Sequence, residues 1–361
     1  MSKSKLTLII DGNWVLMSRL SVLMNKYQDD ELGKNLQILI LESINKVLNN
    51  FPDIDNIVFV SDGGSWRTKI DIPEFFKDDE NIDILEYKGQ RKLSPDVNWD
   101  LVFKYYEDMI ELFNNHNITT CRTQDIEGDD WCWYWSNKLN KEGVNTIIWS
   151  MDKDLFQLIS YNETTGVFNV CWNSKTGLTT NINDSNDDSM AFFFEDVYKQ
   201  NNSRIMNNVF MKSHNINYID NPNSIVLDKI IRGDKGDNIY PIVLKRSNNA
   251  QSNKVFRVST KDIDFDLDLN NDQNIKNYIH NLVNSKKYLN KINKSEENIF
   301  EHFKYNYKLI CLTKNNYPDY ILDNMKSYNF IYNQNIRNSI KEILNYLLAS
   351  KNNNIDILES I

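Results

Sequence analysis

Three short apolar runs in the first half of the chain each stop at, or just before, aspartates. They are "LTLII" before Asp11, "IVFV" before Asp62 and "IIW" before Asp152 and Asp154. Short runs of this kind, rich in β-branched residues and bounded by turn residues, are typical of buried strands. Segments with apolar residues at helical spacing separate the runs, at 35–48 and 99–113. Strands that alternate with helices predict an α/β domain with a largely parallel sheet.

After about residue 160 the chain no longer shows this alternation of predicted strands and helices. A hairpin is predicted at "NVCWNSKTGLTTNI", helical spacing fills most of 273–348, and the alternating "DIDFDLDLNN" predicts a half-exposed strand or extended edge. The length of 361 residues is enough for one large or two ordinary domains. We therefore expect three parts: a core over 1–180, an Asn/Asp/Ser-rich insertion over 181–223, and a mainly helical region over 224–361.

The acidic residues are unevenly distributed. Nine carboxylates stand at the ends of predicted elements or in acid-rich turns: Asp11, Asp62, Glu127, Asp129, Asp130, Asp152, Asp154, Asp234 and Asp237. Net charge is −9, which is unusual for a protein that binds nucleic acid. Without these nine, the 50 acidic residues fall to 41 and balance the 41 Lys and Arg. The negative excess is thus no larger than this set.

Carboxylates at strand ends indicate a metal site. In open α/β sheets, sites form outside the carboxyl ends of the strands, so different strands deliver Asp11, Asp62 and the Asp152/Asp154 pair to one edge. One aspartate of that pair is explained as a helix cap, but the second is not. Close carboxylates resist ionisation unless a cation is present, and oxygen ligands suit Mg²⁺ or Mn²⁺. Two such ions about 4 Å apart can act on a phosphodiester.

Other chemistries fit less well. The strand followed by "DKD" resembles the Asp-x-Asp motif of haloacid-dehalogenase-type phosphatases, but Phe156 stands where that motif has Thr or Val. An EF-hand loop needs an oxygen ligand at Phe156 and a glycine at Gln157. There is no Walker A loop and no HExxH motif, and the four histidines are isolated. The four scattered cysteines imply neither zinc nor disulfides and predict a reducing cytoplasm, and no apolar run could span a membrane.

Six segments occur in an order that identifies a family. They are "IIDGNW", "FVSDGGSWRTKI", "YKGQRK", "IEGDDWCW", "SMDKDLFQL" and "IIRGDKGDNI". Together they resemble the flap endonuclease/5′-to-3′ exonuclease family, and within it the T-even-phage branch, over most of residues 6–245. The resemblance implies a PIN-like nuclease core with a mostly parallel central sheet flanked by helices. It also implies a short arch near 85–100 and a helical C-terminal DNA-binding region.

The resemblance also implies roles for individual residues. First-metal ligands are Asp11, Asp62, Asp129 and Asp152; second-metal ligands are Asp154, Asp234 and Asp237; outer-shell positions are Glu127 and Asp130. Lys88 and Arg91 match catalytic residues that hold the scissile phosphate and offset transition-state charge. Nucleic-acid contacts are expected from Arg67, Lys92, Lys235, Lys245 and Arg246. An ordinary solvated basic turn is the alternative for "YKGQRK".

The implied activity is cleavage of branched or 5′-flapped DNA and of RNA–DNA hybrid during primer removal, with two Mg²⁺ ions for which Mn²⁺ substitutes. A monomer is expected, with a single-strand-binding protein or a sliding clamp as candidate partners. The sequence departs from the family where "YPIVLKRSNNAQSN" replaces a glycine-rich helix–turn–helix segment, which predicts altered duplex binding. The alternative from another class is a non-catalytic, branched-DNA-binding replication factor with a nuclease fold.

Overall fold

The computed structural model describes residues 5–74, 86–89, 91, 94–173, 175–181, 216–243, 257–289 and 294–353. The chain divides into two compact units. Unit 1 comprises Met1–Gly64, Leu93–Asp220 and Pro318–Ile361, and unit 2 comprises Ser65–Lys92 and Asn221–Tyr317.

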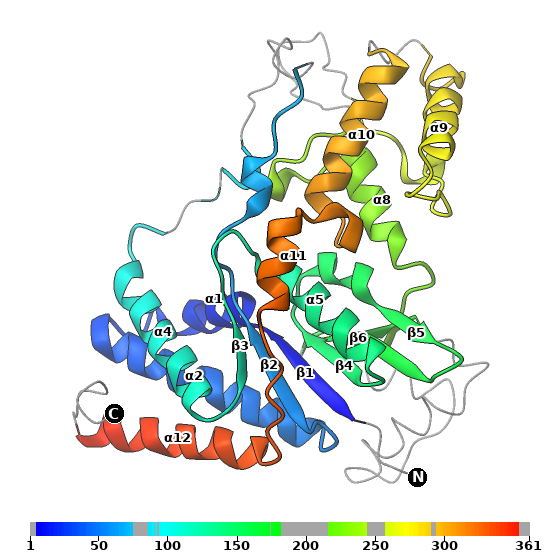
Figure 1. Ribbon diagram of the computed structural model, residues 1–361. Helices are drawn as coiled ribbons and strands as arrows, with labels where there is room; N and C mark the ends of the chain where they lie inside the picture. The colour runs from blue at the N-terminus through cyan, green and yellow to red at the C-terminus, as the bar shows by residue number, and fades with distance from the viewer. Residues whose placement is uncertain are drawn as a thin grey trace. The chain divides into compact units, whose positions relative to one another are not determined.

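Unit 1 is built on a mostly parallel sheet. Its described strands are β1 (Leu6–Asp11), β2 (Asn56–Val60), β3 (Thr119–Cys121), β4 (Asn145–Trp149), β5 (Ser160–Asn162), β6 (Val167–Asn173), β7 (Gly177–Thr180) and β8 (Ile216–Tyr218). The order is β3-β2-β1-β4-β6-β7-β8, with β5 paired to β6. The five neighbouring strands β3-β2-β1-β4-β6 run parallel to one another. The next strand, β7, is antiparallel to β6, and these two strands form the predicted hairpin. The α/β prediction and the three aspartate-ending strands are confirmed (Figure 1).

Helices cover both faces of this sheet. One core joins β1 side chains such as Leu8 and Ile10 to α1 (Gly12–Leu23), α2 (Asp29–Asn50), α4 (Trp99–Asn115) and α12 (Ile336–Asn353). The helix α5 (Gly128–Lys141) packs along β1, β2, β4 and β6 without joining that core, which places it on the other face. Alternate β1 residues point to opposite faces, so Asp11 shares the α5 side with Ile9.

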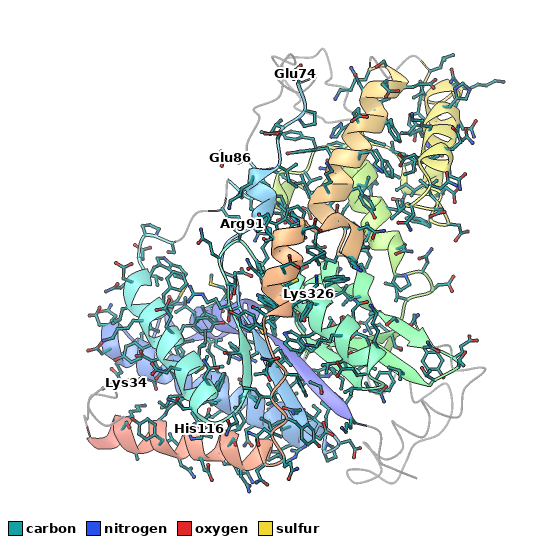
Figure 2. All side chains as sticks on the ribbon, in the orientation of Figure 1. Lys34, Glu74, Glu86, Arg91, His116 and Lys326 are labelled. Carbon is teal, nitrogen blue, oxygen red and sulfur yellow. The ribbon has the colours of Figure 1, made fainter. Side chains whose placement is uncertain are left out.

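The division into units differs from the expected parts, because the last helices return to unit 1. The helix α12 packs on α2, and Arg337 donates hydrogen bonds to the carbonyls of Leu48 at 2.6 Å, Phe51 at 3.0 Å and Pro52 at 2.9 Å. Just before α12, Asn333 Nδ2 donates to the carbonyl of His116, which Figure 2 labels. An amphipathic pattern predicts a buried face but does not identify the surface that covers it.

The expected insertion lies largely outside the described residues. Only its first residue, Asn181, and the part from Ile216 onward belong to the structure described here. β8 pairs in parallel with β7, and Ile219 N–H donates to the Thr180 carbonyl at 2.9 Å. The chain therefore returns to the sheet edge that it left at β7.

Unit 2 is mainly helical, as expected. It contains α8 (Asn223–Arg232), α9 (Asp272–Asn284) and α10 (Glu296–Ile310), and α11 (Asp319–Lys326) follows in unit 1. The strand or extended edge expected over 262–271 is wrong, since a 3-10 turn at Thr260–Asp262 leads into further turns. Within the described ranges, no helix combines the length and apolar character needed to cross a bilayer.

Candidate functional site

Asp11 is held in place at the junction of β1 and α1. It is the last residue of β1 and the N-cap of α1, where one carboxylate oxygen, Oδ1, accepts a hydrogen bond from Trp14 N–H at 3.0 Å. The other oxygen, Oδ2, accepts from the Ser150 hydroxyl at 2.7 Å. Only 6% of Asp11 is exposed. Both oxygens are therefore oriented before any ligand binds.

The surroundings of Asp11 favour the protonated form of its carboxyl group. Its pKa is raised from the ordinary 3.8 to about 7, mainly by burial and in smaller part by the negative charges of Asp62 and Asp152. The hydrogen bonds from Trp14 and Ser150 act in the opposite direction but do not cancel the effect. A divalent cation beside these three carboxylates would reverse the balance, because it favours the ionised form.

Asp62 follows β2 and faces the start of α5. Its N–H donates to Asn13 Oδ1 at 3.0 Å, and its Oδ1 accepts from Gly128 N–H at 2.6 Å. A Cβ atom at Gly128 would lie 3.0 Å from Asp62 Oδ1 and 3.8 Å from Asp11 Oδ1. The glycine thus leaves room in front of both carboxylates, the kind of space that a metal ion needs.

The first turn of α5 adds three acids with different surroundings. Glu127 is the buried N-cap, Asp129 is half-buried, and Asp130 is fully buried. Asp130 Oδ2 accepts a hydrogen bond from Glu127 N–H at 3.1 Å. This bond closes the start of the helix, so Asp130 has a structural task whether or not it also contacts metal-bound water. The outer-shell roles of Glu127 and Asp130 stay predictions.

Asp129 belongs to the same charged neighbourhood as the strand-end aspartates. Burial raises the pKa of the Cys132 thiol well above its ordinary value, and the charges of Asp11, Asp129 and Asp62 add to the shift. The thiol therefore stays protonated and is unsuited to ligate metal. The available donors in this part of unit 1 are carboxylate oxygens, which suit Mg²⁺ or Mn²⁺.

The Asp152/Asp154 pair begins a short 3-10 helix, η2 (Lys153–Leu158), after β4. Asp152 caps it, because its Oδ1 accepts a hydrogen bond from Asp154 N–H at 2.9 Å. Asp154 is half-buried in the first turn, whereas Asp152 is exposed. The cap explanation therefore accounts for Asp152 alone, and Asp154 needs another one.

Ser150 is a residue that the sequence analysis missed. It is 2% exposed, and it links two of the acids: its hydroxyl donates to Asp11 Oδ2 and accepts from Asp152 N–H at 3.0 Å. The sequence offered one indication of this role, a small hydroxyl residue between a buried strand and an acidic turn. Serine is common at turns of this kind, so its presence did not single out Ser150.

In unit 2, Asp234 and Asp237 lie in one tight turn. Asp234 Oδ1 accepts from Gly236 N–H at 2.8 Å, and its Oδ2 pairs with Lys229 Nζ at 2.5 Å. Burial alone raises the pKa of Asp234, but the Lys229 ammonium, Gly236 N–H and the Arg91 charge together hold the pKa below its ordinary value. Asp234 is thus compensated by cations, unlike Asp11.

The "YKGQRK" segment packs against this turn within unit 2. Lys88 adopts a left-handed conformation (φ 57°), and its N–H donates to the Asp237 carbonyl at 3.1 Å. Arg91 pairs with the Asp237 carboxylate; Figure 2 labels Arg91 and Glu86 on this stretch. Tyr87 of the same segment is buried in the core of unit 2. Two predicted catalytic residues and one predicted ligand are therefore neighbours.

The remaining predicted contacts are dispersed. Arg67 is 2% exposed with its guanidinium 4.7 Å from the ring centre of Trp66, while Lys235 is exposed on the Asp234–Asp237 turn. The predicted contacts Lys92, Lys245 and Arg246 lie outside the described residues. Unit 1 thus brings together Asp11, Asp62, Asp129 and Asp152, and unit 2 brings together Asp234 and Asp237.

The N-terminal half of the chain matches a known family model. Residues 6–187 match the model of the 5′-3′ exonuclease N-terminal resolvase-like domain. Among curated relatives, a 5′-3′ exonuclease of Mycoplasmopsis pulmonis is 25% identical over 242 residues, which is 67% of this chain and 63% of that protein. A 5′-3′ exonuclease of Buchnera aphidicola is 26% identical over 164 residues, covering 44% of this chain and 51% of that protein. The matched region is therefore less than two thirds of each relative's length.

Solved structures share the fold. A flap endonuclease of bacteriophage T5, crystallised with DNA and metal ions, is 16% identical with a TM-score of 0.52 and covers 96% of this chain and all of that one. A T5 5′-exonuclease with bound zinc is also 16% identical, with a TM-score of 0.51, and covers 96% of this chain and 99% of that one. At this identity the likeness supports the α/β fold with a helical C-terminal region.

Proposed function

Because the chain belongs to the 5′-3′ exonuclease family through its N-terminal resolvase-like domain, we propose that it is a metal-dependent, structure-specific 5′-nuclease. It hydrolyses phosphodiester bonds as a 5′-to-3′ exonuclease and a 5′-flap endonuclease. The observation that carries the proposal is the gathering of Asp11, Asp62 and Asp152 at the strand ends, where burial and repulsion hold the pKa of Asp11 at about 7. Such a set is costly to a fold unless a cation binds to it.

The residues fit two divalent ions, Mg²⁺ in the cell and Mn²⁺ as a substitute. When bound, the ions supply an activated water and a counter-charge for the leaving oxygen. The first set of ligands is Asp11, Asp62, Asp129 and Asp152, with Glu127 and Asp130 in outer positions; the second is Asp154, Asp234 and Asp237.

The chain's own residues orient the ligands and the substrate. Ser150 and Trp14 N–H fix the two oxygens of Asp11, and Gly128 N–H fixes one oxygen of Asp62. Lys88 and Arg91 hold the scissile phosphate and offset the charge that develops on it. The Arg91 side chain is 58% exposed, which leaves it accessible to a phosphate group.

The proposed substrates are branched or 5′-flapped DNA and RNA–DNA hybrid, and the proposed role is primer removal in replication. The motif set most resembles the T-even-phage 5′-nuclease called phage ribonuclease H. The T5 flap endonuclease was crystallised with DNA, which supports a DNA substrate for this fold. Lys92, Lys235, Lys245 and Arg246 are the proposed nucleic-acid contacts, and Arg67 is left out of the proposal because only 2% of it is exposed. A monomer assisted by a single-strand-binding protein or a sliding clamp completes the proposal.

The test is cleavage of a 5′-labelled flap duplex in Mg²⁺ and in EDTA, by wild type and by Asp154→Asn. We expect short 5′ products from wild type in Mg²⁺ only, and none from Asp154→Asn, which should still bind the flap. Asp323→Asn is the matched control, since Asp323 is 70% exposed and pairs with Lys326. Full activity of Asp154→Asn would contradict the two-metal mechanism.

Two outcomes would favour other functions. Flap binding without cleavage, in Mg²⁺ and Mn²⁺ alike, would favour the non-catalytic replication factor. Release of inorganic phosphate from a small phosphate monoester, without flap cleavage, would favour a phosphatase.

A further inference from the structure

The turn that carries Asp234 and Asp237 is a closed loop of unit 2. The chain leaves α8 at Arg232 and returns through Ile239. Asp234 and Ile239 exchange two backbone hydrogen bonds, each 2.8 Å long. Just beyond, Ile242 N–H donates to the Ile231 carbonyl at 3.1 Å. The positions of the two carboxylates therefore depend on how the base of this loop is held.

A single side chain from another helix spans that base. Asn306 of α10 is completely buried, and its Nδ2 donates to the Ile230 carbonyl and to the Tyr240 carbonyl, at 2.8 Å each. One carbonyl precedes the loop and the other follows it. The Ile230 carbonyl lies in the last turn of α8, where carbonyls lack helical donors, so the amide also completes the helix end.

The side-chain hydrogen bonds of Asn306 both go to the base of the loop. Among the described residues, none donates a hydrogen bond to its Oδ1, so its polar interactions come from the nitrogen. A buried acceptor without a donor is unfavourable. An apolar residue would avoid that cost, which argues that the amide is kept for the two carbonyls. One turn earlier, the fully buried His302 interacts with the backbone of Tyr240 and Ile242. This face of α10 is polar although its neighbours, such as Phe303, are apolar.

We propose that Asn306 is a positioning residue, which holds the base of the loop closed and thereby sets the spacing of Asp234 and Asp237 for the second metal ion. The inference rests on the proposed function, because that function assigns a metal to these aspartates. Asn306 touches neither metal nor substrate. Its loss should let the base of the loop open and weaken metal binding roughly 10- to 100-fold, the range found when groups that orient metal ligands are removed.

The test compares two asparagines of the same region. Asn306→Leu keeps the branched shape and the number of side-chain heavy atoms, although its methyl groups are bulkier, and it removes both N–H groups. Asn316→Leu is the control, since Asn316 Nδ2 donates to the carbonyls of Tyr307, Lys308 and Cys311 at the end of α10 and to none in the loop. Flap cleavage is measured against Mn²⁺ concentration at saturating substrate, and amide hydrogen exchange is measured over 231–242.

We expect Asn306→Leu to raise the KM for Mn²⁺ at least tenfold, in line with the range above, while kcat at saturating Mn²⁺ changes little. Exchange over 231–242 should become faster in the same variant. Asn316→Leu should keep the wild-type KM for Mn²⁺ even where its melting temperature falls. A residue with a merely structural role would lower the melting temperature without this split between KM and kcat.

An unchanged KM for Mn²⁺ in folded Asn306→Leu overturns the proposal. Should that variant fail to fold, Asn306→Ser takes its place, because one hydroxyl can serve only one of the two carbonyls at a time; the same two measurements then decide. If wild type neither cleaves the flap nor binds Mn²⁺, the proposed function fails instead. The exchange data still report whether Asn306 closes the loop, so the two failures are distinguishable.

Discussion

Substitution of Asp11 by asparagine should stabilise the metal-free protein at neutral pH and above. The carboxylate is buried, and Asp62 and Asp152 repel it, so the folded state binds a proton there more tightly than the unfolded chain does. Asparagine is uncharged at every pH. It also caps helices well and can keep the hydrogen bond from Trp14 N–H, and its amide can donate to the Ser150 hydroxyl.

The size of the effect follows from the pKa of Asp11. A folded pKa of about 7 against the ordinary 3.8 corresponds to roughly 4 kcal/mol at most, since each pH unit is about 1.36 kcal/mol. Between these two values only the folded state holds the proton, so the free energy of unfolding falls as pH rises. Above a pH of about 7 the full cost is present, and below about 4 it vanishes.

The assay is urea unfolding in EDTA from pH 4 to pH 8.5, for wild type and Asp11→Asn, with Asp323→Asn as the exposed control. Asp11→Asn should match wild type at pH 4 and exceed it by up to about 4 kcal/mol at pH 8. Saturating Mg²⁺ should narrow or reverse the difference, because it binds only the folded wild-type site. Equal stability of the two proteins at pH 8 in EDTA would refute the reasoning about uncompensated charge.

Three further outcomes are expected. Gly128→Ala places a Cβ 3.0 Å from Asp62 Oδ1 and should abolish the Mg²⁺-induced rise in melting temperature, measured with and without EDTA. Ser150→Ala removes a buried hydrogen bond to Asp11 and should lower the free energy of unfolding by about 1–3 kcal/mol, measured by urea unfolding at pH 7. Lys88→Ala should lower kcat for flap cleavage by roughly 10²- to 10³-fold without changing the KM for Mg²⁺, if its ammonium stabilises the transition state.

The strand-end aspartates could be predicted because two local signals coincide there. A buried parallel strand is apolar throughout, so a charged residue at its end stands out, and parallel strands bring such ends together. Asp11, Asp62 and Asp152 were therefore expected at one edge of the sheet, and the structure confirms that position. Ser150 escaped because its role depends on a hydrogen bond to a residue 139 positions away.

The strand or extended edge predicted over 262–271 was wrong, because that prediction used only the alternation of apolar and acidic residues. In "DIDFDLDLNN" the apolar residues alternate as in a strand, and Ile263 and Leu267 are indeed buried. The aspartates between them bond the local backbone instead: Asp264 Oδ1 accepts from Asp266 N–H at 3.1 Å. Asp and Asn side chains stabilise turns in this way, and that local preference prevailed over the period-two pattern.

The two aspartate sets differ in how the fold compensates their charge, and this difference determines what pH does to each unit. In unit 1 the pKa of Asp11 is raised, so stability is lost as pH rises toward 7. In unit 2 the Lys229 ammonium, Gly236 N–H and the Arg91 charge together outweigh the burial of Asp234 and lower its pKa, so stability is lost as pH falls through the acidic range. These two aspartates therefore contribute opposite trends to the pH dependence of the stability of the metal-free protein. Only the difference between wild type and Asp11→Asn isolates the charge that a metal ion in unit 1 would neutralise.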